Sequence, residues 1–482
     1  MRVLSVASEC VPLVKTGGLA DVVGALPSAL AAQGVRVTTL LPGYPAVTSA
    51  LGTGRAVRRI DDLFGHPARL LRGSVAGLDV IAVDAPHLFA RPGNPYLAPG
   101  GGEWGDNGVR FAALGAVAAL LATQPLRGLS FDLVHAHDWQ AGLAPAYLRF
   151  AYSARRVPAV FTVHNLAFQG KFPLSLFPVL GLPPEALSVH GLEYFGSIGF
   201  LKAGLWYADR ITTVSPTYAA EIRTPEAGMG LDGLLRGRAG AVSGILNGID
   251  PAEWNPETDA ALAARFSIND PAPRAANKAA LQARLGLAPD QEAPLLGFVG
   301  RLTWQKGVDL LLGALPALLG AGAQLVVLGT GEPGLEAGCR AAAGANPGRI
   351  GVAIGFDEPL ARLIYGGVDS VLVPSRFEPC GLAQLCALRY GAPPVVAHVG
   401  GLADSVIDAN EMALAIGAGT GVHFAPVTRE MLEAAILRAI ALSRDRAAWR
   451  RLQANAMATD VSWTRSAARY AELYRATIAD AS

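Results

Sequence analysis

Short apolar runs rich in β-branched residues recur along the whole chain, and they constrain the fold more than any other feature. The runs are RVLSVAS, VRVTTLLP, LDVIAVDAP, DLVHAHD, PAVFTVHN, RITTVSP, LLGFVGR, QLVVLG, RIGVAIG, SVLVPS and PPVVAHVG. Their length fits parallel strands that are buried on both faces, and the amphipathic or Ala-rich stretches between them fit crossover helices. The sequence therefore predicts an α/β fold built on parallel sheets.

A stretch rich in Pro, Asp and Asn, from Asn247 to Pro294, divides these runs into six and five. Eleven strands are too many for one comfortable doubly wound sheet, and such a stretch is typical of a domain boundary. We therefore expect two Rossmann-like, doubly wound parallel-sheet domains. Because ligands of open α/β sheets bind beyond the carboxyl ends of the strands, we expect the two domains to face each other across a cleft.

The charges of the chain nearly cancel. Forty Lys and Arg residues against 39 Asp and Glu leave a formal net charge of +1. No overall field favours nucleic acid or an anionic membrane surface, so neither is expected as a partner. The first apolar run ends at Glu9 and is typical of a buried strand rather than of a signal peptide.

The cysteines indicate the compartment. The four are Cys10, Cys339, Cys380 and Cys386. They lack the paired spacing of a zinc site and are too few for a disulfide framework in a chain of this length. We interpret them as reduced thiols, which predicts a cytoplasmic location.

A glycine-rich turn follows the first predicted strand. Lys15 precedes Gly17 and Gly18, and a helix is expected to begin near Leu19. Glycines allow backbone N–H groups to approach a phosphate, the helix N-terminus adds partial positive charge, and the lysine adds a full one. An ordinary βα turn with a solvated lysine is the alternative, and this segment alone does not decide between them.

Polar residues end two later strands of the first half. His135 and His137 are expected on one face of their strand, with Asp138 pointing the opposite way. No further ligand has the spacing of a metal site, so we interpret the cluster as polar cleft lining. His164 and Asn165 end the next strand, where an imidazole can bond a sugar hydroxyl or satisfy backbone groups.

The second half carries two cations after its first strand. Arg301 and Lys306 lie five residues apart in GRLTWQKG, and two such cations neutralise a diphosphate without a metal. Glu378 precedes Cys380, Gly381 and Leu382, which are predicted to open a helix with N–H groups toward the same cleft. No histidine is spaced to activate Cys380, so a small apolar role is expected for it.

A formal G-x-G-x-x-G pattern offers a different function. Gly329, Gly331 and Gly334 follow the strand QLVVLG, and Asp357 lies at the distance that the dinucleotide fingerprint requires. A nicotinamide-dependent oxidoreductase is therefore an alternative. Pro333 inside the motif and the motif's place in the second half favour an ordinary turn instead.

An ordered series of motifs resembles one enzyme family over nearly the whole chain. The motifs are KTGGLADV, PYL followed by DNGVRF, HAHDW, TVHN, FLKAGLWYAD, TTVSPTYAAEI, LNGID, GRLTWQKG, VPSRFEPCGL and GGLADSVID. Their order is that of bacterial glycogen synthase and plant starch synthase. The resemblance implies a GT-B architecture and retaining transfer of glucose from ADP-glucose to the nonreducing end of an α-1,4-glucan, glycogen included. It implies no metal and no redox cofactor.

The resemblance also implies domain bounds. Residues 1–245 are expected to form the N-terminal domain on the acceptor side, and residues 246–460 the domain that binds the nucleotide sugar. Residues 461–482 are expected to form a helix that crosses back to the first domain.

Site residues follow from the same resemblance, position by position. Lys15 and the Gly17 and Gly18 backbone resemble contacts to the phosphate side of the donor. Arg301 and Lys306 resemble the diphosphate clamp, and Glu378 resembles the carboxylate that supports the oxocarbenium-like transition state. The remaining expected contacts are His164 and Asn247 to glucose hydroxyls, Asp138, Asp21 and Tyr96 on the sugar or acceptor side, Phe356 against adenine, and Cys380, Gly381 and Leu382 at the helix start.

Two positions depart from the family pattern. Cys386 stands where many GT-B enzymes carry a second glutamate, and Ala383 stands where a hydroxyl residue is frequent. Two other functions remain open beside the oxidoreductase. They are a GT-B enzyme that uses UDP-glucose or another acceptor, and a catalytically silent glucan-binding protein.

Overall fold

The computed structural model describes residues 1–52, 54–151 and 156–481. The chain divides into two compact units. Unit 1 comprises Met1–Asn247 together with Trp463–Ser482, and unit 2 comprises Gly248–Ser462. Among the described residues, no helix combines the length and the apolarity that crossing a membrane requires.

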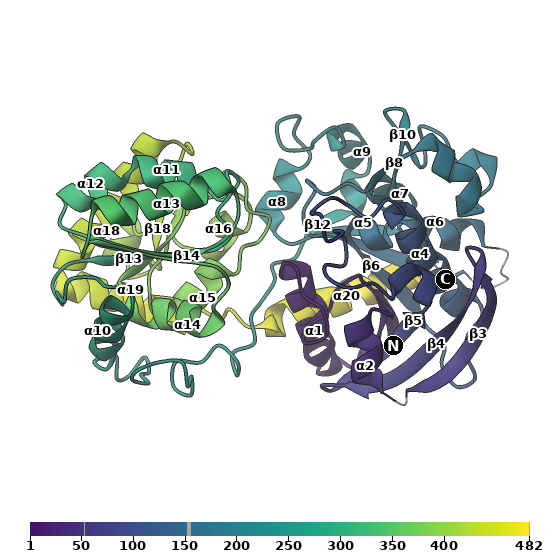
Figure 1. Ribbon diagram of the computed structural model, residues 1–482, viewed down its shortest axis with the longest axis horizontal. Helices are drawn as coiled ribbons and strands as arrows, with labels where there is room; N and C mark the ends of the chain where they lie inside the picture. Colours follow the sequence, from purple (N-terminus) through teal and green to yellow (C-terminus); the bar gives the residue numbers. More distant parts are fainter. Residues whose placement is uncertain (53, 152–155, 482) are drawn as a thin grey trace. The chain divides into compact units, whose positions relative to one another are not determined.

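Unit 1 is built on a nine-stranded sheet in the order β12-β11-β7-β6-β1-β2-β5-β4-β3 (Figure 1). Its strands are β1 Arg2–Val6, β2 Arg36–Pro42, β3 Arg55–Leu63, β4 His66–Val75, β5 Leu78–Asp84, β6 Leu133–His137, β7 Ala159–Val163, β11 Arg210–Thr213 and β12 Val242–Gly244. The seven strands from β12 to β5 run parallel, whereas β4 is antiparallel to both β5 and β3. A small sheet of β8 Lys171–Pro173, β10 Ser197–Gly199 and β9 Glu193–Tyr194 stands apart.

The helices of unit 1 connect these strands. They are α1 Gly18–Ala31, α2 Pro45–Leu51, α3 Pro86–Phe89, α4 Asn107–Thr123, α5 Asp138–Ala141, α6 Leu143–Phe150, α7 Phe200–Tyr207, α8 Pro216–Glu221, α9 Asp232–Gly237 and α20 Trp463–Ala481, with 3-10 turns at Leu174–Leu180, Pro184–Ala186 and Ala239–Ala241. The last helix, α20, packs beside α1 although the two are far apart in sequence (Figure 1). Trp463, Tyr470 and Tyr474 of α20 lie in one buried cluster with Val3 and Leu133, so the chain's last helix completes the core of unit 1.

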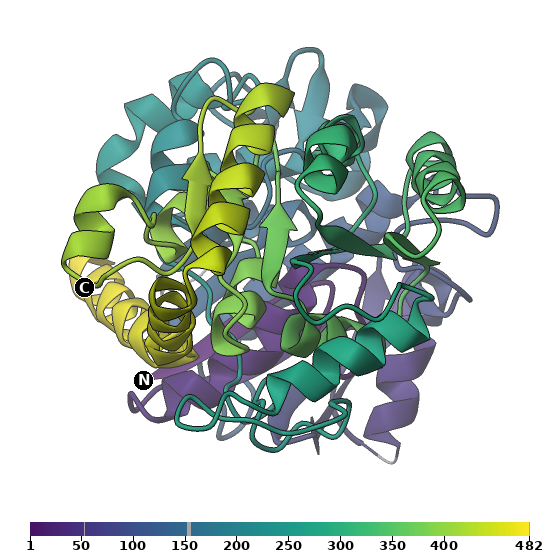
Figure 2. The same cartoon turned by 90° about the vertical axis from the view of Figure 1, so that its left-hand side faces the viewer.

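Unit 2 is built on a six-stranded parallel sheet in the order β15-β14-β13-β16-β17-β18. Its strands are β13 Leu295–Val299, β14 Gln324–Gly329, β15 Ile350–Ile354, β16 Ser370–Val373, β17 Val395–Ala397 and β18 Val422–Phe424. Its helices are α10 Arg274–Arg284, α11 Val308–Gly313, α12 Leu315–Gly320, α13 Pro333–Ala345, α14 Glu358–Gly367, α15 Ala383–Arg389, α16 Gly400–Ser405, α17 Glu411–Ala415, α18 Arg429–Arg444 and α19 Arg446–Ala458. Helices α11 and α13 cover one face of this sheet and α14 and α15 the other, and Figure 2 brings this unit to the front.

All eleven predicted strands are present, and the two α/β units confirm the predicted fold class. The strands that the sequence did not reveal are of two kinds. The first kind is two or three residues long and comprises β8, β9, β10, β12 and β18. The second kind comprises β3 and β4, which carry mostly half-buried or exposed residues. β3 and β4 extend the first sheet at one edge as an antiparallel hairpin, beyond the parallel strands that the sequence predicted.

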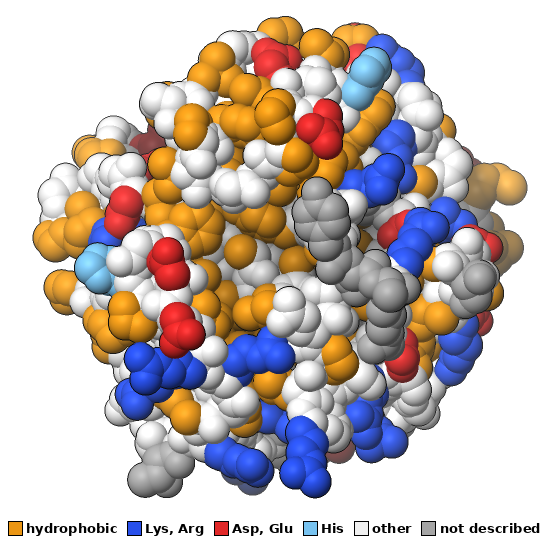
Figure 3. Space-filling model, turned by 90° about the vertical axis from the view of Figure 1, so that its right-hand side faces the viewer, with side chains coloured by type: hydrophobic (Ala, Val, Ile, Leu, Met, Phe, Trp, Pro, Cys, Tyr) orange, Lys and Arg blue, Asp and Glu red, His pale blue; other side chains and the backbone are white. Residues whose placement is uncertain are grey.

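The β3–β4 hairpin carries arginines at directly opposed positions. Arg55 faces Arg72, and Arg59 faces Arg69. Lys and Arg side chains gather along the lower part of the face drawn in Figure 3. Like charges opposed across a ladder destabilise it. Two aspartates from β5 offset the repulsion, since Asp79 pairs with Arg72 at 2.8 Å and Asp84 with Arg69 at 2.5 Å.

Candidate functional site

In unit 2, a buried carboxylate and a lysine from two loops meet. Glu378 is 5% exposed and forms an ion pair with Lys306, although the two residues are 72 positions apart. The Ser375 hydroxyl donates a second hydrogen bond to the same carboxylate oxygen at 2.8 Å. Both loops follow the carboxyl ends of strands, β13 for Lys306 and β16 for Glu378. Since β13 and β16 are neighbours in the sheet, the fold brings the two charges together.

Gly307 explains how the Lys306 loop comes so close to the Glu378 loop. Its φ of +69° is a left-handed conformation that favours glycine. A Cβ at this position would lie 2.0 Å from the carbonyl oxygen of Pro374, which precedes Ser375. Only a residue without a side chain permits this approach, so Gly307 holds the two loops in contact.

Replacing Gly307 with Ala should therefore destabilise unit 2 strongly. Left-handed strain and a backbone clash together should cost about 3 kcal/mol or more of unfolding free energy. Urea denaturation of the intact chain measures this. Gly320→Ala is the matched control, because a Cβ there meets nothing within 4 Å and its φ is not positive. Equal stabilities of the two variants would contradict the role assigned to Gly307.

The remaining cations of these loops differ in how strongly they are held. Arg376 donates two hydrogen bonds to Asp309, each of 2.7 Å, and its guanidinium lies 4.4 Å from the Trp304 ring centroid. Arg301 makes one long contact, 3.4 Å from its Nη2 to Gln305 Oε1. Arg376 is therefore a structural cation, whereas Arg301 is exposed and weakly held.

The segment after Glu378 packs closely against the GGLADSVID motif, which begins at Gly400. Cys380 is buried, and Gly381 has a φ of +78° just before α15 begins at Ala383. Gly401 donates its N–H to the Glu378 carbonyl at 3.0 Å, and a Cβ on Gly401 would lie 2.3 Å from the Cys380 carbonyl oxygen. The close approach of the Gly401 backbone to residues 378–380 fixes the backbone position of Glu378.

The other predicted residues of unit 2 lie in contrasting environments. Leu382 is half-buried directly before α15, and Cys386 within α15 is 3% exposed, in the core of the unit. Phe356 is 83% exposed, at the loop after β15. A large aromatic side chain this exposed is available to stack on a ligand ring.

The G-x-G-x-x-G segment is a structural turn. Cβ atoms at Gly329 and Gly331 would collide with the carbonyl oxygens of Gly300 and Leu302, at 1.8 and 2.3 Å. The Gly331 N–H, which a pyrophosphate would need, donates to the Glu336 carboxylate at 2.9 Å. These glycines serve the packing of two loops, which explains the pattern without a dinucleotide.

In unit 1, the K-T-G-G loop is organised by a residue that the sequence analysis did not select. Glu9 is 3% exposed, and its carboxylate accepts the N–H groups of Thr16 and Gly17 and the Thr16 hydroxyl. The Tyr96 hydroxyl donates to the same carboxylate. The signal that could have identified it is an acidic residue at the end of the first apolar run. Glu9 therefore fixes the conformation of the loop by accepting hydrogen bonds from Thr16 and Gly17.

The loop itself is exposed. Lys15 pairs with Asp21 of α1 at 2.7 Å, and the Lys15 side chain is 46% exposed. Gly17 and Gly18 have nothing within 4 Å of an added Cβ, so their backbone is open on that side. The Gly17 N–H is occupied by Glu9 at 3.2 Å. Tyr96 bonds Ser8 at 2.7 Å as well as Glu9, which places its ring against this loop.

The two histidines expected to line a cleft are buried. His135 and His137 are each 1% exposed and lie beneath α1 and α20. The prediction of cleft lining was therefore wrong for these two, because the last helix covers that face of the sheet. Asp138 adopts a φ of +55° and turns away to accept the His164 N–H at 2.7 Å. His164, half-buried after β7, is the histidine near the surface.

Burial shifts the pKa values of this group in two directions. Burial lowers the pKa of His135 and of His164 to about 3, and it lowers the pKa of His137 well below its usual value. Burial raises the pKa of Asp138 to about 7, although the backbone N–H groups of His164 and Asn165 partly oppose the shift. The three imidazoles are therefore neutral at neutral pH.

These shifts predict how stability depends on pH. Below the ordinary histidine pKa, the unfolded chain takes up protons that the three buried imidazoles do not, so acidification from pH 6.5 toward 4 destabilises the fold. Asp138 acts in the opposite sense, because its folded pKa is the higher one and its contribution to stability is lost as pH rises through about 7.

Asp138→Asn removes one group that is protonated in the folded state and ionised in the unfolded state. We therefore expect the unfolding free energy of this variant to fall more steeply on acidification, by about 1.4 kcal/mol per pH unit. Unfolding free energies measured by urea at pH 6 and pH 5 test this. The variant keeps an oxygen to accept the His164 N–H, so the comparison isolates the titration. A slope equal to that of the parent chain would show that Asp138 is already ionised in the folded state.

Asn247 is the last residue of the first segment of unit 1, and its side-chain oxygen lacks a hydrogen-bond partner among the described residues. The residue is 9% exposed. A buried acceptor without a partner costs free energy, so such a group is suited to receive a ligand hydroxyl.

No metal centre is formed by the described part of the chain. No group of three or more His, Cys, Asp or Glu side chains there is arranged to hold an ion. All four cysteines are buried, and none of them forms a disulfide.

Comparisons with known proteins identify the family. A family model described as starch synthase catalytic domain matches residues 2–237, and one described as glycosyl transferases group 1 matches residues 283–455. A glycogen synthase of Rhodopseudomonas palustris is 59% identical over 481 residues, which cover 100% of this chain and 99% of the relative. A glycogen synthase of Acidiphilium cryptum is 59% identical over 475 residues, covering 98% and 99%.

A solved structure agrees with these sequences. The catalytic domain of starch synthase IV from Arabidopsis thaliana, bound to ADP and acarbose, matches with a TM-score of 0.87 and 32% identity over 99% of each chain. Matches to whole chains of this identity, with the same two α/β units, establish descent and not only shape. The chain belongs to the family of bacterial glycogen synthases and plant starch synthases, which are GT-B glycosyltransferases.

Proposed function

We propose that this enzyme transfers glucose from ADP-glucose to the nonreducing end of an α-1,4-glucan such as glycogen, with retention of configuration and release of ADP. The observation that carries the proposal is the cation and carboxylate group of unit 2, in which Lys306 contacts the buried Glu378 and Arg301 is weakly held nearby in the same loop. The relatives named glycogen synthase and the starch synthase structure bound to ADP support the substrate class.

The reaction needs positive charge at the leaving group. The bond between the glucose C1 and the phosphate oxygen breaks, and negative charge grows on the departing diphosphate. Arg301 and Lys306 are assigned to that charge, because oriented cations that act where charge develops lower the barrier. Glu378 is assigned to the positive charge that develops on the sugar ring. The new bond joins C1 to the acceptor O4, and the O4 proton passes to the departing phosphate oxygen.

Residues of unit 1 are assigned to the sugar and the phosphate side of the donor. The exposed Lys15 contributes charge, and the open backbone at Gly17 and Gly18 allows close approach. His164 and the unsatisfied Asn247 oxygen are assigned to glucose hydroxyls. Asp138, Asp21 and Tyr96 are assigned to the sugar or acceptor side.

Residues of unit 2 complete the donor site. The exposed Phe356 ring is assigned to adenine, which accounts for a large aromatic side chain left in solvent. Cys380, Gly381 and Leu382 contribute the backbone that follows Glu378. A cytoplasmic location belongs to the same proposal and is supported by four cysteines that form no disulfide.

The deciding experiment measures nucleoside diphosphate release from ADP-glucose and from UDP-glucose, with and without glycogen, in the presence of EDTA. Glycogen-dependent ADP release that survives EDTA is the expected result. Preferential release of UDP would show that the donor is UDP-glucose and not ADP-glucose. Release that does not depend on glycogen would show that the acceptor is not glycogen. Silence with both donors, together with tight NADH binding, would overturn the proposal in favour of an oxidoreductase.

A further inference from the structure

Six polar side chains form a stripe on one face of the unit 1 sheet, near the carboxyl ends of four adjacent strands. They are Ser5 of β1, His135 and His137 of β6, Thr162 of β7, His164 just after β7, and Thr212 of β11. The parallel register sets Ser5 beside His135 and Thr162 beside His137. The alternation of side chains along each strand then directs the whole set to one side.

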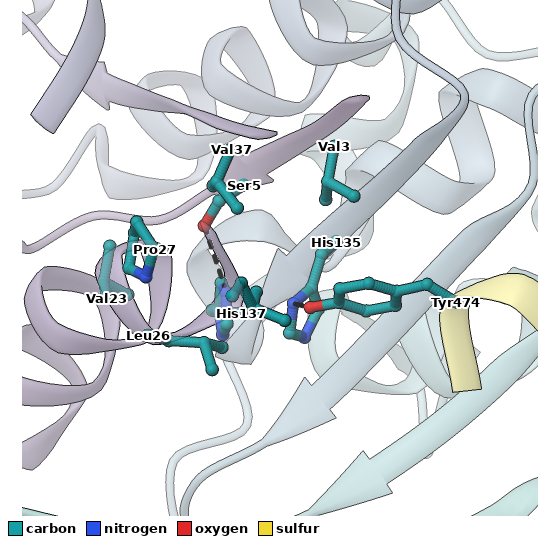
Figure 4. Close-up of a pocket in the computed structure, with 10 residues that line it drawn as sticks. Val3, Ser5, Val23, Leu26, Pro27, Val37, His135, His137 and Tyr474 are labelled. Carbon is teal, nitrogen blue, oxygen red and sulfur yellow. Dashed lines mark hydrogen bonds between the residues drawn. The ribbon is translucent and has the colours of Figure 1, made fainter. Parts of the chain in front are cut away.

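Two separate hydrogen-bond chains run through this stripe. In the first, Ser5 Oγ lies 3.2 Å from His137 Nε2, and His137 Nδ1 lies 3.0 Å from His164 Nε2. In the second, the Tyr474 hydroxyl lies 2.8 Å from His135 Nδ1, and His135 Nε2 lies 2.6 Å from the Thr162 hydroxyl. Figure 4 shows Ser5 pointing at His137 and Tyr474 reaching His135 from α20. Only the first chain ends on His164.

The protons of the first chain have one consistent order. His137 is neutral, so one ring nitrogen donates and the other accepts. If the Ser5 hydroxyl donates to His137 Nε2, then His137 Nδ1–H donates to His164 Nε2. Every buried donor in the chain is then paired. His164, also neutral, must carry its own proton on Nδ1.

The reverse order leaves a buried donor without an acceptor. If His137 donates to Ser5, the Ser5 hydroxyl proton needs a further partner, and none exists among the described residues. The adjoining cavity has a volume of about 10 Å³, at the lower limit for one water, and most of its lining is apolar, from Val3, Val23, Leu26, Leu30 and Val37. The ring nitrogens of both histidines beside it are already paired, so a water there would lack the two to four polar partners that it needs.

We propose that Ser5 and His137 are positioning residues that fix His164 in one orientation and in its Nδ1–H tautomer, so that His164 acts as a hydrogen-bond donor to the substrate. The role toward a sugar hydroxyl rests on the proposed function, whereas the tautomer does not. Asp138 assists, because its Oδ1 accepts a hydrogen bond from the His164 backbone N–H at 2.7 Å and so fixes the backbone of that residue. Partners that orient a functional imidazole through its second nitrogen are a general device in protein sites.

The tautomer is tested on the full chain without substrate. Nitrogen-15 NMR of the eight histidines distinguishes Nδ1–H from Nε2–H imidazole, and a His164→Gln variant assigns the signal. We expect His164 as a single Nδ1–H tautomer in the parent chain. A His164 signal from the Nε2–H form, or from exchange between the two forms, would overturn the proposal whether or not the enzyme is active.

Activity tests the positioning role with a matched pair of variants. His137→Asn keeps an amide donor close to the place of Nδ1, whereas His137→Phe removes it. We expect His137→Phe to lower kcat about 10-fold to 100-fold, the range of effects typical of residues that orient a functional group. His137→Asn should recover most of this loss and restore the Nδ1–H signal of His164.

His135→Phe is the control, because His135 is equally buried on the same strand and makes no hydrogen bond to His164. Both Phe variants should lose stability, and His135→Phe should retain the parent tautomer and change kcat less than about 3-fold. Equal losses of kcat in His135→Phe and His137→Phe would overturn the positioning role. An inactive parent chain would count against the proposed function, and the NMR result would still decide the tautomer.

Discussion

Replacing Glu378 with Gln is expected to lower kcat for glucose transfer by about 10²-fold to 10³-fold, the range measured when one charge-stabilising group is removed from a site. The buried carboxylate is the anionic group that contacts Lys306, and that lysine pairs with no other acid in the part of the chain that the structure describes. Initial rates of ADP release at saturating ADP-glucose and glycogen measure the effect. Glu433→Gln, at a half-buried position of α18, is the control and should keep parental activity.

Loss of folding must be separated from loss of chemistry in this variant. Removing one member of a buried pair leaves the other charge uncompensated, so Glu378→Gln should also cost about 1–3 kcal/mol of stability. The double variant Lys306→Met/Glu378→Gln removes both charges and should recover much of that stability. It should remain as inactive as the single variant. Recovery of activity together with stability would show that Glu378 only holds the fold.

Replacing Lys15 with Met is expected to lower kcat/KM for ADP-glucose by about 100-fold or more, because an exposed cation assigned to the donor phosphates is lost. Its pair with Asp21 is solvent-exposed and should contribute no more than about 1 kcal/mol to stability. The melting temperature should therefore change little, which makes the loss of activity a direct measure of the interaction with the donor.

Lys171→Met provides the comparison for Lys15. Lys171 is also an exposed lysine of unit 1, and its ammonium lies 5.9 Å from the Tyr194 ring centroid. This variant should keep parental kcat/KM. Near-parental activity of Lys15→Met would remove Lys15 from the site, whereas a similar loss in both variants would indicate a general effect of lost charge.

The predictable part of the fold was the part whose signal is local. Each predicted strand is a run of apolar residues buried on both faces, so its composition alone marks it. β3 has no such signal, because most of its nine residues are half-buried or exposed and it carries arginines on both sides. A hairpin stabilised by partners on β5 cannot be recognised from its own composition.

The candidate site divides in the same way. Lys15, Arg301, Lys306 and Glu378 were selected because charged residues stand in glycine-rich turns after apolar strands. The contact of Lys306 with Glu378 across 72 residues was not visible, since it depends on β13 lying next to β16 in the sheet. Glu9 was missed for the same reason. Its partners Thr16, Gly17 and Tyr96 converge on it only after the chain folds.

The sequence by itself determined the class of fold, the division into two units and the set of residues that we propose to bind a diphosphate sugar. It could do so because hydrophobic periodicity, turn chemistry and charge are properties of neighbouring residues. Only the tertiary structure decided that α20 covers His135 and His137 and so removes them from the surface. The half-buried His164 is then the end of the hydrogen-bond chain that begins at Ser5. Burial and hydrogen-bond direction are set by residues distant in sequence, such as Tyr474 and His135, and no local pattern contains them.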